Sequence, residues 1–153
     1  MSAPSELLER PPNNLAFGDV HLHFSRIVPG DATRDFVPYY HFRILAADEM
    51  DAGHINFRVG DTEHVRLFAG HIGFEISEKF RGRGLALEAC RAIAPFVRTF
   101  YEAVIITCDP DNHASIRTIE KLGASFIDEV TVPSHVSHCA QGLRTKRRYR
   151  WTP

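Results

Sequence analysis

Residues 73–86 read GFEISEKFRGRGLA, and this stretch decides the fold of the chain. An apolar strand pattern leads into a turn that contains Gly82 and Gly84, and a helical pattern begins directly after the turn. A helix that starts in this way leaves peptide N–H groups unpaired at the positive end of its dipole. These groups form an anion site suited to phosphate oxygens, to which Arg81 and Arg83 add positive charge. The spacing is neither that of a P-loop nor that of a Rossmann fingerprint, and taken alone it is also compatible with an ordinary turn.

A second informative stretch follows a short apolar strand at residues 104–108. Asn112 and Ser115 lie three residues apart at a predicted helix start, so both side chains can face one cleft. Asn112 offers a hydrogen-bond donor and an acceptor to a ligand that carries amide groups. A purely structural role competes with this one, in which Asp111 or Asn112 caps the helix.

Periodicity over the whole chain predicts one α/β domain at residues 18–153, preceded by an N-terminal arm at residues 1–17. The predicted order is β-β-β-β-α-β-α-β-β. Pro95 lies inside the first helix and should kink or split it. The predicted strands are residues 19–27, 39–46, 53–59, 65–76, 104–108, 125–132 and 144–151, and the predicted helices are residues 85–100 and 115–122.

The composition is that of an ordinary globular protein, with 153 residues of which 44% are apolar and 24% charged. No apolar run approaches the roughly 18 residues that a membrane helix needs, and the first residues lack the basic and apolar segments of a secretory signal. The three cysteines, Cys90, Cys108 and Cys139, are too scattered for a disulfide framework or a zinc site, and Cys108 is expected to be a small buried hydrophobe. We therefore expect a cytoplasmic protein with no membrane partner.

Charge is distributed unevenly along the chain. The net charge of −1 argues against a general nucleic-acid binder. Five basic residues nevertheless lie among the last ten, namely Arg144, Lys146, Arg147, Arg148 and Arg150. A charged edge strand protected from aggregation is the simplest interpretation. An anionic ligand or an acidic partner, nucleic acid included, is the alternative.

Two motifs together resemble a known enzyme family. Residues 81–86, RGRGLA, match the pattern R/Q-x-x-G-x-G/A. Residues 112–115, NHAS, match N-x-x-A/S, and EKLG follows at residues 120–123. Over about residues 40–130 the chain is similar to the GNAT superfamily of acetyl-CoA-dependent N-acetyltransferases. Ser115 and the GFEI segment look most like the subgroup that contains ribosomal-protein N-terminal acetyltransferases.

The resemblance implies a mixed, mostly antiparallel sheet flanked by helices and splayed between its fourth and fifth strands. The pantetheine arm of acetyl-CoA would lie in the gap, with its pyrophosphate at the glycine-rich turn. A primary amine, on a small molecule or at a peptide N-terminus, would attack the thioester directly, and no metal is implied. The implied cofactor contacts are Phe74, Ile76, Arg81, Gly82, Arg83, Gly84, Leu85, Ala86, Asn112 and Ser115.

Such a reaction calls for a general base. Neutralising a lysine with a pKa near 10.4 at pH 7 costs about 4.6 kcal/mol, whereas an α-amine near 7.8 costs about 1 kcal/mol. Glu75, beside the implied bulge of the fourth strand, is the first candidate. His71 is the second candidate and His54 the third, because an ordinary histidine pKa suits the task. Strand alternation could instead point Glu75 to solvent, and a single histidine on a strand is commonly structural.

The chain departs from the family in two places. Many members carry a tyrosine, the acid that protonates the leaving thiolate, where this chain has Ile119, so Ser115 or water would have to donate that proton. The family also has two helices between its first two strands, whereas about 14 residues separate Phe24 from Tyr39. The acceptor side would then be open, or completed by Tyr39, Tyr40, the arm or a second subunit of a homodimer. These departures leave a non-catalytic acyl-CoA-binding module as the alternative function.

Histidines gather in two further places, and neither predicts a metal site. His21 and His23 share one strand face, while His135, His138 and Cys139 cluster in a predicted loop. No carboxylate or CxxC motif completes a tetrahedral set of ligands around either group.

Overall fold

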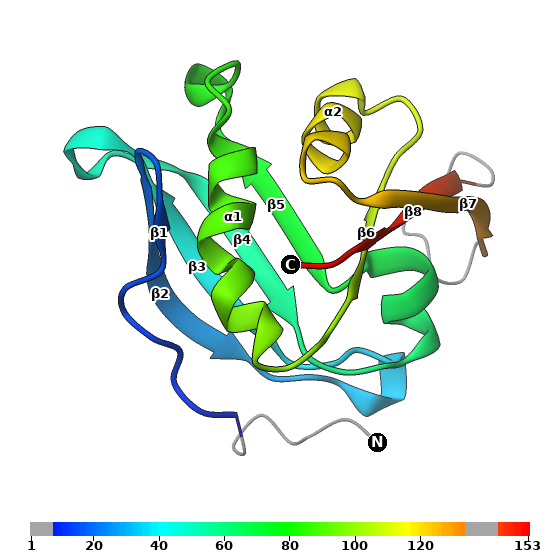
Figure 1. Ribbon diagram of the computed structural model, residues 1–153. Helices are drawn as coiled ribbons and strands as arrows, with labels where there is room; N and C mark the ends of the chain where they lie inside the picture. Colours follow the sequence, from blue (N-terminus) through cyan, green and yellow to red (C-terminus); the bar gives the residue numbers. More distant parts are fainter. Residues whose placement is uncertain (1–7, 134–143) are drawn as a thin grey trace.

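A twisted eight-stranded sheet runs through the molecule (Figure 1). The computed structural model describes residues 8–133 and 144–153. The strands are β1 (Ala16–Phe17), β2 (Val20–Val28), β3 (Tyr39–Leu45), β4 (Asp51–Arg58), β5 (Ile72–Ile76), β6 (Val104–Cys108), β7 (Ser125–Val132) and β8 (Arg144–Trp151). The helices are α1 (Leu85–Arg98) and α2 (His113–Lys121), with short helical turns η2 (Ala32–Arg34), η3 (Ala47–Glu49), η4 (His64–Ala69) and η5 (Glu78–Phe80).

The strands lie in the spatial order β1-β2-β3-β4-β5-β6-β8-β7. All neighbours are antiparallel except β5 and β6, which are parallel, so the predicted mixed and mostly antiparallel α/β fold is confirmed. Ala16 pairs with His21 and Phe17 with Val20, so the sheet begins inside the arm predicted for residues 1–17.

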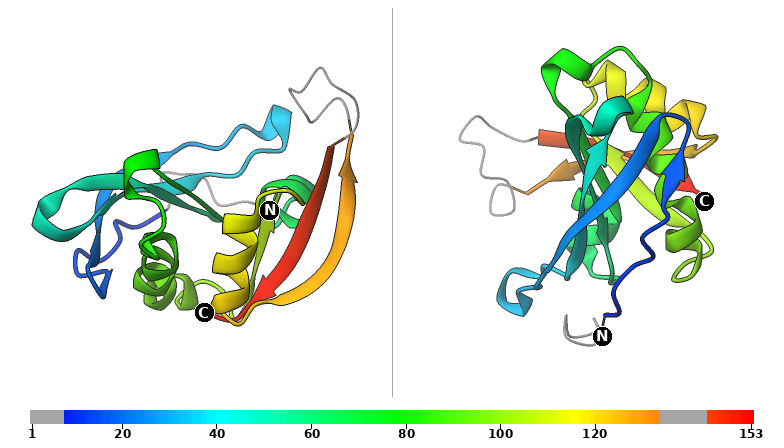
Figure 2. Two further views of the ribbon diagram at one scale, coloured as in Figure 1. Left: turned by 90° about the horizontal axis from the view of Figure 1, so that it is seen from above. Right: turned by 90° about the vertical axis from the view of Figure 1, so that its left-hand side faces the viewer.

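The main core lies between the sheet and α1, which covers one face of β1 to β5 (Figure 2). Alternate side chains of β3 and β4 point toward the helix, and Phe42, Ile55 and Phe57 have no exposed surface. The ring of Phe96 on α1 lies edge-on to that of Phe57, with 5.8 Å between their centroids. Each such aromatic side chain buries enough apolar surface to contribute about 2–3 kcal/mol, so the apolar stripe of α1 fixes its position on the sheet.

Pro95 was predicted to kink or split this helix; α1 continues through it to Arg98, so the helix is not split. Proline removes one backbone hydrogen bond and costs about 3 kcal/mol in a helix interior. Ile93, Phe96 and Val97 on either side of it are buried against the sheet, and their burial outweighs that cost.

The long strand predicted over residues 65–76 is also wrong in its first half, which forms the π-helix η4. Val65 and Phe68 of this turn are both buried. The Asp35 carboxylate accepts a hydrogen bond from the N–H of His64 at 3.2 Å, and the Thr62 hydroxyl accepts one from that of Val65 at 3.3 Å. Asp35 and Thr62 thus accept hydrogen bonds from the free N–H groups at the start of η4. An apolar run in the sequence does not reveal that such partners exist.

The basic last strand, β8, lies inside the sheet between β6 and β7, so the charged edge strand predicted there is wrong and β7 is the edge. Its cations face acids on neighbouring segments: Arg148 contacts Asp128 at 2.8 Å, Lys146 contacts Asp109 at 2.8 Å, and Arg147 contacts Glu129 at 3.5 Å. Local pairing therefore accounts for most of this charge. Tyr149 and Trp151, also on β8, are buried.

Strands β5 and β6 separate almost at once. Their register contains the single pair Ile72 and Ile106, and Figure 1 shows them diverging from there toward the start of α1 and toward α2. None of the helices in the described ranges has the length and apolar character needed to cross a bilayer.

Candidate active site

The turn between β5 and α1 presents a row of backbone donors. Gly82 and Gly84 have φ of 81° and 74°, in the left-handed region that favours glycine. No hydrogen bond from the N–H groups of residues 82–87 occurs within the described part of the chain. The first such bond of the helix runs from Glu88 to the carbonyl of Gly84 at 3.1 Å, and no side chain caps the helix. The turn therefore has free backbone donors of the kind that an anion site needs, and the site itself stays a prediction.

A groove of about 530 Å³ begins at this turn and runs between α1, β5 and α2. It brings together nearly all of the predicted cofactor contacts from three separate segments. Those that line it are Phe74, Ile76, Arg81, Gly82, Gly84, Leu85, Ala86, Asn112 and Ser115. The groove does not include Arg83, whose guanidinium lies over the ring of Phe80 at 5.3 Å.

Helix α2 forms the opposite wall of the groove. The carbonyl oxygen of the Asn112 side chain accepts a hydrogen bond from the N–H of Ser115 at 3.1 Å, so Asn112 caps the helix as the structural alternative held. Its amide nitrogen can still donate to a ligand, and Asn112 also lines the groove. The two roles therefore coexist in one residue.

The α2 wall also carries a stripe that the motif search missed. Ala114, Arg117, Thr118 and Lys121 follow the helical spacing i, i+3, i+4, i+7 and all line the groove. The sequence shows this spacing, but only the structure shows that this side of α2 faces the groove. Arg117, Lys121 and Arg81 together make the groove strongly basic, which suits a phosphorylated nucleotide.

The gap between β5 and β6 leaves backbone groups of β5 without a strand partner. The N–H of Ser77 donates to the carbonyl of Ala52 at 2.8 Å, so the odd-numbered residues here direct their peptide groups toward β4. Phe74 and Ile76 consequently direct theirs toward β6, which no longer pairs with them. The Ile76 carbonyl accepts a hydrogen bond from Nε of Arg81 at 2.9 Å, and the Phe74 peptide group faces the groove.

A second pocket of about 270 Å³ opens on the other side of the gap. It shares Phe74, Asn112 and Ser115 with the first groove, so the two spaces meet at the divergence of the strands. Arg58 of β4 and Lys146 of β8 also line it. Between β2 and β3 the chain forms only the short turn η2, as the spacing of those strands predicted. This fully described connection therefore supplies no helical wall beside the sheet.

Of the predicted catalytic residues, Glu75 and Ser115 line the groove. Glu75 is exposed and lies in register with His54 on β4, so both side chains are on the same sheet face. Burial, helped by the nearby charges of His41 and Arg43, lowers the pKa of His54. Ile119 is fully buried and lines neither pocket.

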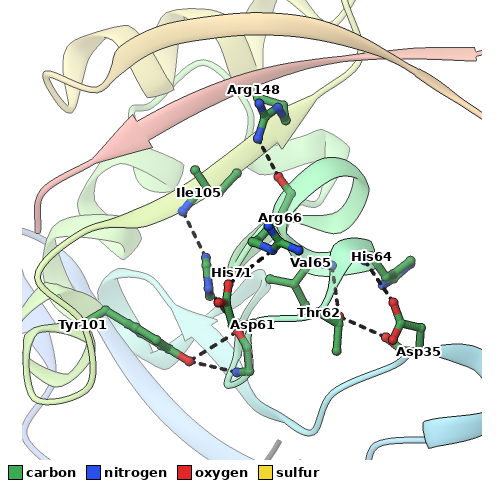
Figure 3. A network of polar contacts seen from close by, with 11 residues as sticks. Asp35, Asp61, Thr62, His64, Val65, Arg66, His71, Tyr101, Ile105 and Arg148 are labelled. Atoms are coloured by element: carbon green, nitrogen blue, oxygen red, sulfur yellow. Dashed lines mark hydrogen bonds and ion pairs between the residues drawn. The ribbon is translucent and has the colours of Figure 1, made fainter. Parts of the chain in front are cut away.

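His71 lies away from both pockets, in a network of polar contacts between the segment that precedes η4 and β6 (Figure 3). Its Nδ1 accepts a hydrogen bond from the N–H of Ile105 at 3.0 Å, which leaves the proton on Nε2 to donate to the Gly60 carbonyl at 3.2 Å. Burial lowers the pKa of His71. A neutral histidine with both ring nitrogens engaged ties β5 to β6 just before they separate.

This arrangement predicts a pH-dependent stability. The folded state disfavours protonated His71, whereas the unfolded chain binds the proton with a pKa near 6.5, so the free energy of unfolding falls as the pH drops below about 6.5. The contribution is at most about 1.4 kcal/mol per pH unit. Urea unfolding at about pH 7.5 and about pH 5.5 measures it. A His71→Gln variant should show a smaller loss between the two pH values, and an equal loss would contradict this role.

The remaining reactive side chains are secondary to the site. Cys108 is buried at the wall of the second pocket, and burial raises the pKa of its thiol, as suits a small hydrophobe. His21 lies 3.7 Å from Glu49. Within residues 8–133 and 144–153 there is no cluster of three or more metal-ligating side chains, and His135, His138 and Cys139 lie outside these residues.

Comparisons with known proteins agree with this geometry. A family model described as an acetyltransferase (GNAT) domain matches residues 12–125. A search of curated proteins finds no match. Among solved structures, the Salmonella typhimurium acetyltransferase that modifies the N-terminal serine of 50S ribosomal subunit protein L7/L12 is 17% identical, with a TM-score of 0.59 over 75% of this chain and 64% of that one.

Two further structures share the fold. The microcin C7 self-immunity acetyltransferase MccE, solved with acetyl-CoA and AMP, is 19% identical, with a TM-score of 0.57 over 75% of this chain and 61% of that one. A GNAT-family acetyltransferase from Bacillus anthracis is 22% identical, with a TM-score of 0.57 over 73% and 65%. The chain thus spans less than two thirds of the length of these three proteins. Because the family model covers most of its length, the chain belongs to the GNAT acetyltransferase family.

Proposed function

We propose that the protein transfers the acetyl group of acetyl-CoA to a primary amine by direct attack. The main support is the row of N–H groups at residues 82–87 that find no partner among the described residues and open onto a basic groove beside a split sheet. A diphosphate needs several closely spaced donors, and a helix start supplies them at the positive end of its dipole. Family membership supports the same cosubstrate.

The residues present fit acetyl-CoA along the length of the groove. The pyrophosphate would take the N–H groups of residues 82–87, with Arg81 and Arg117 nearby. The pantetheine amides would meet the free peptide groups of β5 and the amide nitrogen of Asn112. The acyl end would then reach Phe74 and Ser115, where the groove and the second pocket meet.

Each proton then has a candidate carrier on this chain. When bound, acetyl-CoA supplies a thioester carbon that an amine nitrogen can attack. The C–N bond forms as the C–S bond breaks, so the nitrogen must lose a proton and the sulfur can gain one. Glu75 at the groove wall takes the first proton, and the hydroxyl of Ser115 passes a proton to the sulfur in place of the missing tyrosine and regains one from water.

Release of free CoA tests the proposal. We expect acetyl-CoA to release CoA faster with at least one class of primary amine, drawn from small amines and N-terminal peptides, than with buffer alone. The buried Ile119 favours the alternative of a non-catalytic acyl-CoA-binding module. Tight CoA binding in calorimetry without release for any acceptor would select that module instead.

A further inference from the structure

Arg58 is a half-buried cation that no acid neutralises within the described part of the chain. Its Nη1 donates to the carbonyls of Ala69 at 3.4 Å and Gly70 at 3.3 Å, and the guanidinium lies 5.8 Å from the ring centroid of Tyr39. Among residues 8–133 and 144–153 it forms no ion pair. Burial lowers the pKa of Arg58. A charge removed from water without a partner is costly, so this position favours an anion.

The guanidinium faces the second pocket. A Cβ placed on Gly73 would lie 3.2 Å from Nη1 and 3.7 Å from Nη2 of Arg58, so the guanidinium occupies the space over this glycine. Both residues line the pocket. Lys146 also lines it, but its ammonium already contacts Asp109 at 2.8 Å. Among the described residues that line the pocket, Arg58 is therefore the cation that remains available to an occupant.

The position of the second pocket indicates which kind of ligand it would bind. The pocket meets the cosubstrate groove at Phe74, Asn112 and Ser115 and lies across the gap from the anion turn. A molecule held there approaches the acyl end of the groove from the side opposite the pyrophosphate. An acetyl acceptor would have to approach the thioester from this side.

We propose that Arg58 binds a carboxylate of the acceptor, and that the acceptor is a small amine carrying a carboxylate, such as a free amino acid. The identification of this ligand as the acetyl acceptor rests on the proposed function, whereas the presence of an anion site at Arg58 does not. A guanidinium pairs with a carboxylate through two parallel hydrogen bonds. The volume of about 270 Å³ suits a small molecule, and it falls below the range of about 300–1,000 Å³ typical of drug-sized ligands. A peptide N-terminus would present a neutral amide at the same place.

The test compares L-amino acids with the corresponding L-amino-acid amides as acceptors of acetyl from acetyl-CoA. We expect kcat/KM for the best acids to exceed that for their amides by about 10- to 100-fold, the usual discrimination of a charge-assisted hydrogen bond. Arg58→Gln should bring the ratio close to one by raising KM for the acids, with the Kd of CoA unchanged. Arg58→Lys should restore part of the ratio.

Arg43→Gln is the matched control, because Arg43 lies on the same sheet face, contacts Asp51 at 2.8 Å and lines neither pocket. It should leave the ratio unchanged. Equal kcat/KM for acids and amides in the unaltered protein, or a ratio that survives Arg58→Gln, overturns the proposal. The first comparison needs no variant, so it holds even if Arg58→Gln does not fold.

An equilibrium measurement separates this inference from the transfer reaction. Calorimetry with N-acetyl-L-amino acids and their amides, in the presence of CoA, requires no turnover. Arg58-dependent binding of the acids without acetylation of any amine would refute the transferase and support the anion site. Acetylation of amines with no preference for acids, in binding or in turnover, would support the transferase and refute the anion site.

Discussion

Replacement of Gly84 by glutamate weakens CoA binding by about 100-fold or more while the fold is kept. The added carboxylate stands at the turn whose N–H groups face the groove, and a like charge about 4 Å from a phosphate near a protein surface costs about 4 kcal/mol. A Cβ at Gly84 meets open space, so no core contact is lost. The φ of 74° adds strain of about 1–2 kcal/mol to the folded state. Calorimetric titration with CoA measures the effect.

Gly123→Glu provides the matched control. Gly123 follows α2 with a φ of 83°, its Cβ would also meet open space, and it does not line the groove. This variant should pay the same backbone strain and add the same charge, yet bind CoA as the unaltered protein does. An unchanged CoA affinity in Gly84→Glu would refute the placement of the pyrophosphate at this turn.

Replacement of Glu75 by glutamine slows acetyl transfer by about 100-fold or more at neutral pH, the usual contribution of a general base. The loss shrinks as the pH rises above the pKa of the acceptor amine, because the amine then loses its proton to water without help. Initial rates of CoA release across this pH range, at saturating acetyl-CoA, measure both effects.

Glu78→Gln is the control for charge. Glu78 is an exposed carboxylate on the neighbouring turn η5 and lines neither pocket, so its pH profile should overlay that of the unaltered protein. A Glu75→Gln profile that runs parallel to the unaltered one at every pH would remove Glu75 as the base. His54, which lies opposite Glu75 on β4 and stays neutral near pH 7 because burial lowers its pKa, would then be next in line.

The parts of the site that the sequence predicted are those set by local chemistry. The glycines of the anion turn, the stripe of α1 and the cap at Asn112 each depend on residues within a few positions of one another. The helical spacing of Arg117 and Lys121 was equally local, but a polar stripe is also what any solvated helix face shows.

The errors arise where distant segments decide the structure. A short apolar run such as residues 65–69 suits a strand or a buried helix equally, and η4 is selected partly by Asp35, far earlier in the chain. His71 carried the pKa of a base in isolation, and its bonds to Gly60 and Ile105 appear only once β4 and β6 flank it. No pattern in the sequence marks Arg58 as a site residue. Its guanidinium lies over Gly73 on the next strand, where a side chain would occupy the same space.

The divergence of β5 and β6, which opens room for a ligand, also exposes the protein to aggregation. Two inner strand borders with unmatched amide and carbonyl groups are the kind of template on which foreign chains add and fibrils grow. Helix α2 and the beginning of α1 stand on the two sides of this opening (Figure 1), and residues of both line the groove. The same helices that would hold the cosubstrate thus also cover these unpaired strand borders, which protects the protein from aggregation at this gap.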